Sequence, residues 1–212
     1  MAILHSIFKN KLLPAVTVAD SNSALSVAGA FLEAGLNVME ITFRTQAAAS
    51  FISAIAKEYP QMNVGAGTLL TADNVIAAKD SGAAFGLAPG YNKHVAAKAL
   101  EMDFPFIPGV MTPSDIESAF EAGFDLLKVF PIQALGGAGY IKNMEGPYLH
   151  TGIKFIPMGG VNMNNMTSYL KYESVLAVGG SWLNPGSLIE QQKYREITEI
   201  VRQSIAKTSS DK

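Results

Sequence analysis

The sequence predicts an α/β fold: a single closed (β/α)8 barrel, or TIM barrel, preceded by a short N-terminal helix. Short apolar runs alternate with longer amphipathic stretches about eight times along the 212 residues, without a break in composition. Such alternation indicates a parallel sheet, and eight units favour its closure into a barrel, although the chain is short for that fold. The alternative is an open, doubly wound sheet, which needs a Gly-x-Gly-x-x-Gly turn after an early strand, and none is present there.

The first half of the chain follows this alternation. Each expected strand is a short apolar run, and each expected helix is a longer stretch whose apolar residues recur every three or four positions. Glycine ends two of the helices, at Gly35 and Gly82, and Pro60 ends another. The expected elements, in order, are helix 3–10, strand 13–18, helix 23–34, strand 38–42, helix 47–59, strand 63–67, helix 71–81, strand 84–88 and helix 93–102.

The second half continues in the same way. The segment Thr112-Pro-Ser-Asp115 predicts a helix start, because proline suits the first turn and an acidic residue occupies the capping-box position. Gly123 ends that helix. The expected elements, in order, are strand 106–108, helix 112–122, strand 125–131, helix 140–145, strand 154–158, helix 163–170, strand 175–178, helix 188–206 and a flexible polar tail over 208–212. We expect residues 1–212 to form one domain.

Composition and charge exclude several classes of protein. With 49% hydrophobic and 16% charged residues, a globular protein with a full core is expected, and the net charge of −2 gives no reason to expect nucleic acid or a membrane surface as partner. The absence of cysteine excludes disulfides and thiolate sites. The N-terminus lacks a signal-peptide pattern and no apolar stretch has membrane-spanning length, so a soluble, cytoplasmic protein is expected. No metal site is expected, since none of the histidines ends a strand: His5, His94 and His150.

The expected strand 125–131 contains the main candidate for chemistry. Lys128 lies in the middle of this apolar run and shares a strand face with Leu126 and Phe130. Apolar surroundings disfavour an ammonium group, and a neutral lysine attacks carbonyl carbon to form a Schiff base. The alternative is a structural lysine whose charged end reaches solvent at the end of the strand.

Other candidates lie near strand ends, because the active site of a barrel is built at the carboxyl ends of its strands. Glu40 lies in strand 38–42, and Arg44 follows that strand. Arg44 is the only arginine near a strand end, and its planar guanidinium suits a carboxylate substrate, with a structural Glu40–Arg44 ion pair as the alternative. Thr68 follows a strand of small residues and offers a hydroxyl group, with an ordinary tight turn as the alternative.

Two glycine pairs follow the last two expected strands. Gly159-Gly160 follows strand 154–158, and Gly179-Gly180 with Ser181 follows strand 175–178. The loops after the seventh and eighth strands form the recurrent phosphate site of this fold, where main-chain N–H groups face the anion. Glycine allows the backbone to approach closely, and the Ser181 hydroxyl adds a donor, so a phosphate site is predicted here.

Together these residues resemble a known family, the class I 2-keto-3-deoxy-6-phosphogluconate (KDPG) and 4-hydroxy-2-oxoglutarate (KHG) aldolases. The resemblance covers nearly the whole chain, and it rests on the ordered set Glu40, Arg44, Gly67-Thr68, Pro89-Gly90, Pro108-Gly109, Thr112-Pro113, Lys128-Val-Phe-Pro131, Gly146-Pro147, Gly159-Gly160 and Gly179-Gly-Ser-Trp182. It implies a (β/α)8 barrel that forms a homotrimer, needs no metal or other cofactor, and serves carbohydrate metabolism in the Entner–Doudoroff pathway.

The resemblance also implies a role for each candidate residue. Lys128 would form the Schiff base with the 2-keto carbon, and Glu40 would be the general acid and base. Arg44 and Thr68 would hold the pyruvyl carboxylate. Phe130 would pack beside the imine, and Pro89 would also contact the substrate. The distal phosphate, or a carboxylate in its place, would bind to Gly159, Gly160, Gly180 and Ser181.

Three departures from the common family pattern concern the aldehyde half of the site. Ile132 and Gln133 replace Ala-Glu, Met158 replaces a threonine, and Ala88 replaces a serine. The expected reaction is cleavage of KDPG to pyruvate and glyceraldehyde 3-phosphate, with KHG or 2-keto-3-deoxy-6-phosphogalactonate as alternative substrates. The alternatives from other classes are a phosphosugar isomerase or epimerase, and a barrel that binds a metabolite without turning it over.

Overall fold

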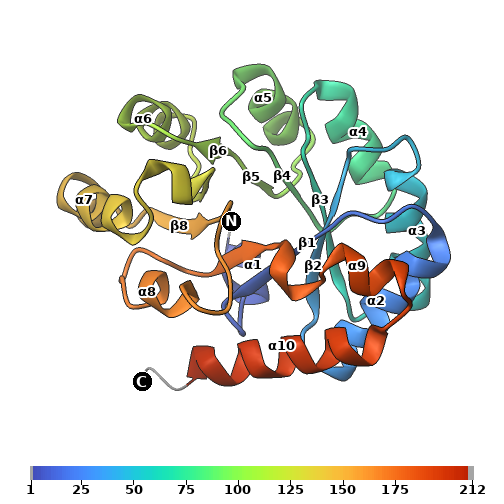
Figure 1. The fold of residues 1–212 in the computed structure, drawn as a ribbon. Helices are drawn as coiled ribbons and strands as arrows, with labels where there is room; N and C mark the ends of the chain where they lie inside the picture. Colours follow the sequence, from blue (N-terminus) through green and yellow to red (C-terminus); the bar gives the residue numbers. More distant parts are fainter. Residues whose placement is uncertain (1, 210–212) are drawn as a thin grey trace.

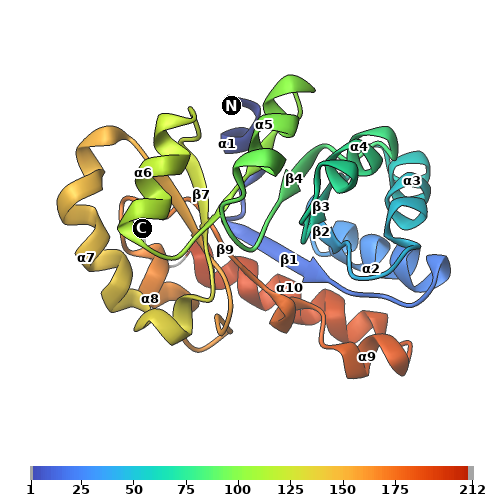
Figure 2. The same ribbon diagram turned by 90° about the horizontal axis from the view of Figure 1, so that it is seen from above.

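The computed structural model describes residues 2–209 and has an α/β fold, in which curled parallel strands are surrounded by helices (Figure 1, Figure 2). The prediction of an α/β fold with parallel strands is therefore confirmed. The strands are β1 Leu12–Val16, β2 Val38–Thr42, β3 Asn63–Gly67, β4 Phe85–Leu87, β5 Phe106–Ile107, β6 Gly109–Val110, β7 Leu126–Val129, β8 Lys154–Pro157 and β9 Val178–Gly180. They form a six-stranded sheet in the order β5-β4-β3-β2-β1-β9 and a three-stranded sheet in the order β6-β7-β8.

Main-chain contacts also join the two sheets on both sides. β5 and β6 are consecutive, separated only by Pro108, whose carbonyl accepts a hydrogen bond of 2.9 Å from Lys128 N. On the other side, single parallel bridges pair Phe155 with Val175 and Met158 with Gly179. The strand expected over 106–108 is therefore two short strands in different sheets, because proline has no N–H group with which to continue a ladder.

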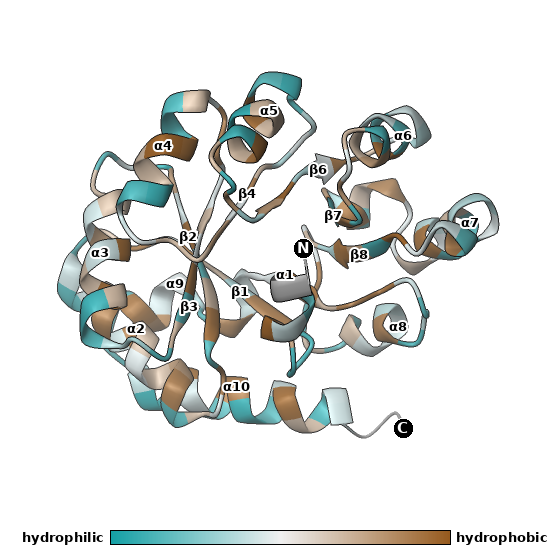
Figure 3. Cartoon of the chain, turned by 180° about the vertical axis from the view of Figure 1, so that it is seen from behind, coloured by the Kyte–Doolittle hydropathy of each residue, from teal (hydrophilic) through white to brown (hydrophobic). Residues whose placement is uncertain are grey.

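The helices lie outside the strands. They are α1 Ala2–Ile7, α2 Ser21–Glu33, α3 Ala48–Glu58, α4 Ala72–Asp80, α5 Lys93–Glu101, α6 Pro113–Glu121, α7 Ala138–Tyr148, α8 Met166–Leu170, α9 Gly186–Glu190 and α10 Tyr194–Ser209, with 3-10 turns η1 Ile132–Leu135, η2 Leu149–Thr151 and η3 Ser181–Leu183. In Figure 3 the strands are mainly hydrophobic, and hydrophilic residues gather on the surrounding helices and loops. This distribution is typical of a parallel sheet that is covered by amphipathic helices.

Several local predictions are confirmed by the geometry. Thr112 caps α6 in a complete capping box, in which its hydroxyl accepts from Asp115 N and the Asp115 carboxylate accepts from Thr112 N. The glycines predicted to end helices have left-handed φ angles, of 85° at Gly35, 87° at Gly82 and 92° at Gly123.

The expected N-terminal helix is present as α1, and it lies at the amino-terminal ends of the strands. His5 in α1 approaches Asp125, just before β7, with 3.7 Å between Nε2 and Oδ1. Phe8 packs edge-on against Phe85, the first residue of β4, with 6.1 Å between the ring centroids. These contacts leave the carboxyl ends of the strands as the accessible end of the fold.

The structure differs from the prediction mainly in the last third of the chain. The helix expected over 140–145 is longer, the helix over 163–170 is shorter, and the strand over 175–178 is displaced to 178–180. The helix expected over 188–206 is broken into α9 and α10 by a turn in which Gln192 has a left-handed φ of 55°. The predicted tail 208–212 is helical at 208 and 209, and residues 210–212 lie outside the described part of the chain.

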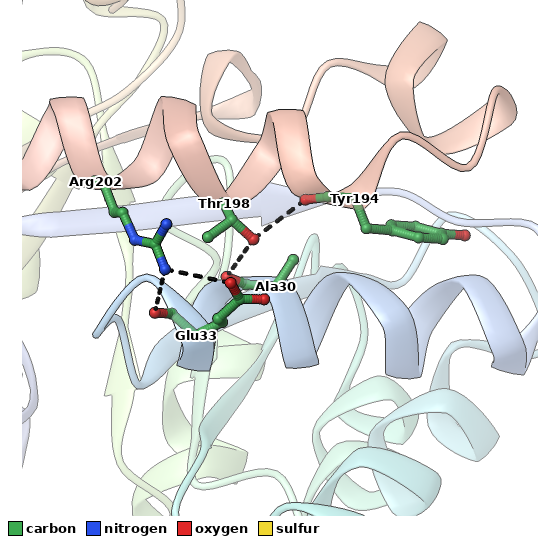
Figure 4. A network of polar contacts seen from close by, with 5 residues as sticks. All are labelled: Ala30, Glu33, Tyr194, Thr198 and Arg202. Atoms are coloured by element: carbon green, nitrogen blue, oxygen red, sulfur yellow. Dashed lines mark hydrogen bonds and ion pairs between the residues drawn. The ribbon is translucent and has the colours of Figure 1, made fainter.

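A polar network fastens α10 to α2 (Figure 4). The Thr198 hydroxyl, which is 2% exposed, lies 3.2 Å from each of the Ala30 and Tyr194 carbonyls and can donate to either. Arg202 donates from Nη2 to the Glu33 carbonyl and carboxylate, each at 3.2 Å. Within the described chain, no helix combines the length and apolar character that a membrane crossing requires.

Candidate active site

One cavity of about 510 Å³ lies at the carboxyl ends of the strands and is lined by every residue to which the family resemblance assigns a role. These residues are Glu40, Arg44, Thr68, Pro89, Lys128, Phe130, Gly159, Gly160, Gly180 and Ser181. They come from both sheets, so the curvature that brings the inner faces of the sheets together also assembles this cavity.

Lys128 and Glu40 face each other across the cavity. Lys128 extends from β7 and Glu40 from β2, with 3.8 Å between Nζ and Oε1. Their side chains are 7% and 1% exposed, and Glu40 Oε2 is buried without a hydrogen-bond partner. Burying a carboxylate oxygen without a hydrogen-bond donor costs free energy. Oε2 therefore indicates a place where a ligand or a water molecule donates a hydrogen bond.

The strand of small residues makes room for this pair. In β3, a Cβ atom at Gly67 would collide with the Glu40 carboxylate, and a Cβ atom at Gly65 would enter the Phe85 ring. The register pairs Glu40 with Gly65 and Thr42 with Gly67, so the carboxylate leans along the neighbouring strand towards its carboxyl end. Glycine at position 67 thus allows Glu40 to be buried in the orientation that faces Lys128.

Phe130 and Gly159 pack together beside the amine. The Phe130 ring centroid lies 5.3 Å from Lys128 Nζ, a cation–π distance. A Cβ atom at Gly159 would stand 2.9 Å from both the Phe130 ring and the Pro131 Cα atom. The glycine therefore lets the loop after β8 pack directly onto the aromatic ring.

Arg44 and Thr68 stand at the rim of the cavity. Among the residues that the structure describes, Arg44 belongs to no ion pair, so the alternative of a structural Glu40–Arg44 pair is wrong. Thr68 is half-buried and has a left-handed φ of 60°, which a β-branched residue adopts at a cost of roughly 1–3 kcal/mol. Such strain at a cavity is typical of a functional position.

The loop after β8 presents main-chain donors to the cavity. Gly159 and Gly160 have left-handed φ angles of 86° and 89°, and their carbonyls accept hydrogen bonds from Gln133 N and from the Asn165 side chain, each at 3.0 Å. Within residues 2–209, the N–H groups of Gly160 and Val161 have no protein acceptor. Consecutive free N–H groups of this kind form an anion-binding concavity.

Sequence reasoning missed part of the cavity wall, namely Ala15, Thr17, Thr42, Val161, Trp182 and Pro185, whereas it indicated Met158 by the departure from the family pattern. Strand periodicity was the available signal for two of them, because residues two apart share a face. Thr42 therefore lies with Glu40, and Thr17 lies with Ala15. For Trp182 the signal is structural, since its indole N–H is buried in the described chain without an acceptor.

Gln133, one of the departures from the family pattern, supports the loop after β8 from outside the cavity. Its Oε1 accepts a hydrogen bond of 3.2 Å from the hydroxyl of Tyr169, which is 1% exposed. Burial raises the pKa of the Tyr169 hydroxyl above its ordinary value, so the hydroxyl keeps its proton and donates. A Cβ atom at Gly160 would collide with Gln133, so this side chain limits the space behind the glycine pair.

A family model described as KDPG and KHG aldolase matches residues 3–200. The chain belongs to the KDPG and KHG aldolase family. It is 35% identical to the 2-dehydro-3-deoxy-phosphogluconate aldolase of Treponema pallidum over 97% of each chain. It is also 35% identical to the KHG/KDPG aldolase of Escherichia coli K12, covering 91% of this chain and 90% of the relative.

Among solved structures, the KDPG aldolase of Legionella pneumophila is similar to this aldolase-family chain. The TM-score is 0.89 at 30% identity, covering 93% of this chain and 96% of the other. That protein was captured with pyruvate as a covalent carbinolamine intermediate. The expected membership in this family of aldolases is therefore confirmed, and with it the expectation of an aldehyde-lyase.

Proposed function

We propose that the chain is a class I aldolase that reversibly cleaves KDPG to pyruvate and glyceraldehyde 3-phosphate through a Schiff base on Lys128. The observation that carries this proposal is the buried pair of Lys128 and Glu40, 3.8 Å apart in the candidate cavity. It is supported by relatives that are named for KDPG cleavage, and by the covalent pyruvate adduct of the Legionella protein.

The first half of the reaction forms the imine. Lys128 passes a proton to Glu40, and its neutral amine attacks the 2-keto carbon of the substrate. A C–N bond forms, the carbonyl electron pair moves to oxygen, and Glu40 returns the proton to that oxygen. Glu40 next takes a proton from the nitrogen of the new C–N bond and gives it to the hydroxyl group of the carbinolamine. The C–O bond breaks, water leaves, and the nitrogen electron pair forms a protonated imine.

The second half cleaves the carbon chain. Glu40, now a carboxylate, takes the proton of the C4 hydroxyl, the C3–C4 bond breaks, and its electron pair moves into the imine to give an enamine. The aldehyde departs, Glu40 returns a proton to C3, and hydrolysis releases pyruvate from Lys128. General acid–base catalysis by such a group contributes about 10²- to 10⁴-fold to the rate.

The remaining candidates hold the two ends of the substrate. The unpaired guanidinium of Arg44 and the strained Thr68 hydroxyl suit the pyruvyl carboxylate, while Phe130 and Pro89 pack beside the imine. The N–H groups of Gly159 and Gly160, with Gly180 and the Ser181 hydroxyl, suit the phosphate. The support is the free N–H groups of Gly160 and Val161 and the presence of both glycine loops in one cavity.

We further propose that both sheets belong to one closed (β/α)8 barrel, which forms a single domain over residues 1–212 and assembles as a homotrimer. Closure is supported by the Lys128–Pro108 hydrogen bond on one side and the Met158–Gly179 bridge on the other. The trimer is supported by the family resemblance and by exposed apolar side chains, such as Leu70 at 54% and Met111 at 47%.

No metal or other cofactor belongs to the proposed mechanism, because the protonated imine itself is the electron sink during cleavage. A cytoplasmic location is also part of the proposal. It is supported by the charge of a phosphorylated sugar acid, since such a molecule does not pass through a lipid bilayer.

KHG is the second candidate substrate, and it is favoured by the relative from Escherichia coli, which is named for both KHG and KDPG. The departures from the family pattern at Gln133, Met158 and Ala88 also allow the site to bind a different aldehyde. In KHG the place of the phosphate is taken by a carboxylate, which the same N–H groups can bind.

The proposal is tested by measuring pyruvate release from KDPG, its galactonate epimer and KHG. We expect kcat/KM to be highest for KDPG. If kcat/KM is highest for KHG or for the galactonate epimer, the substrate assignment is contradicted, but the Schiff-base mechanism still stands. Release from none of them would contradict the aldolase assignment and favour an isomerase, an epimerase or a barrel that only binds a metabolite.

A further inference from the structure

Two hydroxyl groups meet in the cavity where β1 and β2 end. The register pairs Ala15 with Glu40, which places Thr17 opposite Thr42. The Oγ1 atoms of these threonines are 2.9 Å apart, and both residues line the cavity that contains Lys128. Thr42 is 6% exposed, whereas Thr17 is exposed at the edge of the cavity.

The hydrogen-bond partners of this pair leave Thr17 with unused capacity. Thr42 Oγ1 also lies 3.3 Å from the Val16 carbonyl, to which it can donate. If Thr42 donates there, Thr17 donates to Thr42 and its own lone pairs remain available. If Thr42 donates to Thr17, the hydrogen of Thr17 remains available. Within the described chain, Thr17 Oγ1 has no other protein partner, so it can either accept or donate.

A hydroxyl group is the ligand that fits both arrangements, because it also donates and accepts. A phosphate or carboxylate oxygen accepts only, so it fits one arrangement alone. The pair is therefore suited to a neutral hydroxyl group of the substrate, and the free N–H groups of the loop after β8 are suited to its anionic end.

The position of Thr17 in the sheet indicates which hydroxyl group of the substrate it contacts. β1 lies between β2, which carries Glu40, and β9, where Pro14 pairs with Gly180. A substrate that extends from Lys128 and Glu40 to Gly180 and Ser181 therefore passes the end of β1 with its middle carbons.

Two other residues that line the cavity cannot take this role. They are Met158, with its thioether, and Val161, which are 3% and 6% exposed. Neither is a hydrogen-bond donor, and the thioether is only a weak acceptor. Thr17, at the end of β1, is the side chain suited to a hydroxyl group on the middle carbons.

We propose that Thr17, held in place by Thr42, binds the hydroxyl group on the carbon adjacent to the aldehyde carbon. This is the C5 hydroxyl of KDPG and the C2 hydroxyl of glyceraldehyde 3-phosphate. Thr17 thereby selects 2-hydroxyaldehydes over their 2-deoxy analogues. The proposal rests on the aldolase function proposed above, and it adds a specificity-determining residue to that site.

The test is aldol addition of pyruvate to glyceraldehyde 3-phosphate and to 3-oxopropyl phosphate, which lacks the C2 hydroxyl. Thr17→Val keeps the shape of the side chain and removes its hydroxyl. We expect it to lower kcat/KM for glyceraldehyde 3-phosphate about 3- to 10-fold, the effect of one neutral hydrogen bond, and to leave kcat/KM for 3-oxopropyl phosphate unchanged. Thr17→Ser should restore most of the loss. Thr45→Val, outside the cavity, is the control and should affect neither.

The role of Thr42 is tested by combining variants. If Thr42 acts only through Thr17, the variant Thr42→Val also lowers selectivity for the hydroxylated aldehyde. The double variant of Thr17 and Thr42 then loses no more than Thr17→Val alone, which is the non-additive result expected of two groups in one contact. Additive losses would overturn the positioning role of Thr42.

The outcomes separate this proposal from the proposed function. Equal losses with both aldehydes, or no loss with either, would overturn the selection by Thr17 while the aldolase function stands. Borohydride trapping of pyruvate on the wild type and on Thr17→Val reports the imine independently. A wild type that traps no pyruvate would overturn both the aldolase function and the role of Thr17.

Discussion

Glu40 combines almost complete burial with an oxygen that has no hydrogen-bond partner. The variant Glu40→Gln keeps the size of the side chain and removes its ability to carry protons. We expect kcat for KDPG cleavage to fall about 10²- to 10⁴-fold, with a much smaller change in substrate binding. Steady-state kinetics with equilibrium binding of pyruvate checks this. Equal losses of turnover and of binding would indicate that Glu40 is structural.

Gly67 is a second residue whose substitution separates site geometry from general stability. In Gly67→Ala the new methyl group collides with the Glu40 carboxylate, so the carboxylate must move away from Lys128. We expect loss of most activity and destabilisation by about 1–3 kcal/mol. Thermal unfolding and pyruvate release measure the two effects.

The control for that substitution is Gly139→Ala in α7, where a new Cβ atom meets nothing within 4 Å. Alanine favours a helix over glycine, so this variant should be as stable as the wild type or more stable, with unchanged activity. Full activity in Gly67→Ala would contradict the described position of the Glu40 carboxylate.

At the scale of elements, the packing of α10 on α2 depends on a buried hydroxyl more than on an exposed ion pair (Figure 4). Thr198→Val removes a hydrogen-bond donor that is 2% exposed, and should cost about 1 kcal/mol. Arg202→Gln removes a pair whose side chains are 49% and 63% exposed, and should cost less, about 0–1 kcal/mol. Urea unfolding measures both, and the reverse order would contradict this account.

Some elements could be predicted from sequence with their ends, and the reasons are local. Strands 38–42 and 63–67 are found as predicted because turn residues or glycines bound short apolar runs. The break between α9 and α10 could not be predicted, because Gln192 takes a left-handed φ of 55° without a glycine to indicate it. The division of the expected strand 106–108 at Pro108 could have been predicted, since a proline cannot continue a sheet ladder.

The candidate residues could be identified because their chemical types are unusual where they stand: a lysine in an apolar strand, a carboxylate in another, and glycine pairs at two strand ends. Strand periodicity places Thr42 on the face of Glu40 and Thr17 on the face of Ala15. The contact between the two threonines could not be predicted, because it depends on the register between β1 and β2. Register is a tertiary property that a single sequence does not contain. Met158 was indicated by its departure from the family pattern, and the junction of the two sheets brings it into the cavity wall.

For the whole molecule, the proposed homotrimer has a direct test. Sedimentation equilibrium should give a mass of three chains over a wide range of protein concentration, because exposed apolar side chains such as Leu100 and Phe120 favour burial in an interface. A monomer at all concentrations would contradict the trimer and would leave the chemistry of the cavity untouched, since all the proposed site residues belong to one chain.

The central claim is that Lys128 forms an imine with a 2-keto acid, and intact-mass measurement after borohydride reduction with pyruvate tests it most directly. We predict one reduced pyruvyl group per wild-type chain, located on Lys128 by peptide mapping, and none on Lys128→Ala. The wild type treated with borohydride alone is the control and should keep its mass. No adduct on the wild type, or an adduct on another lysine, would contradict the Schiff-base mechanism at this site.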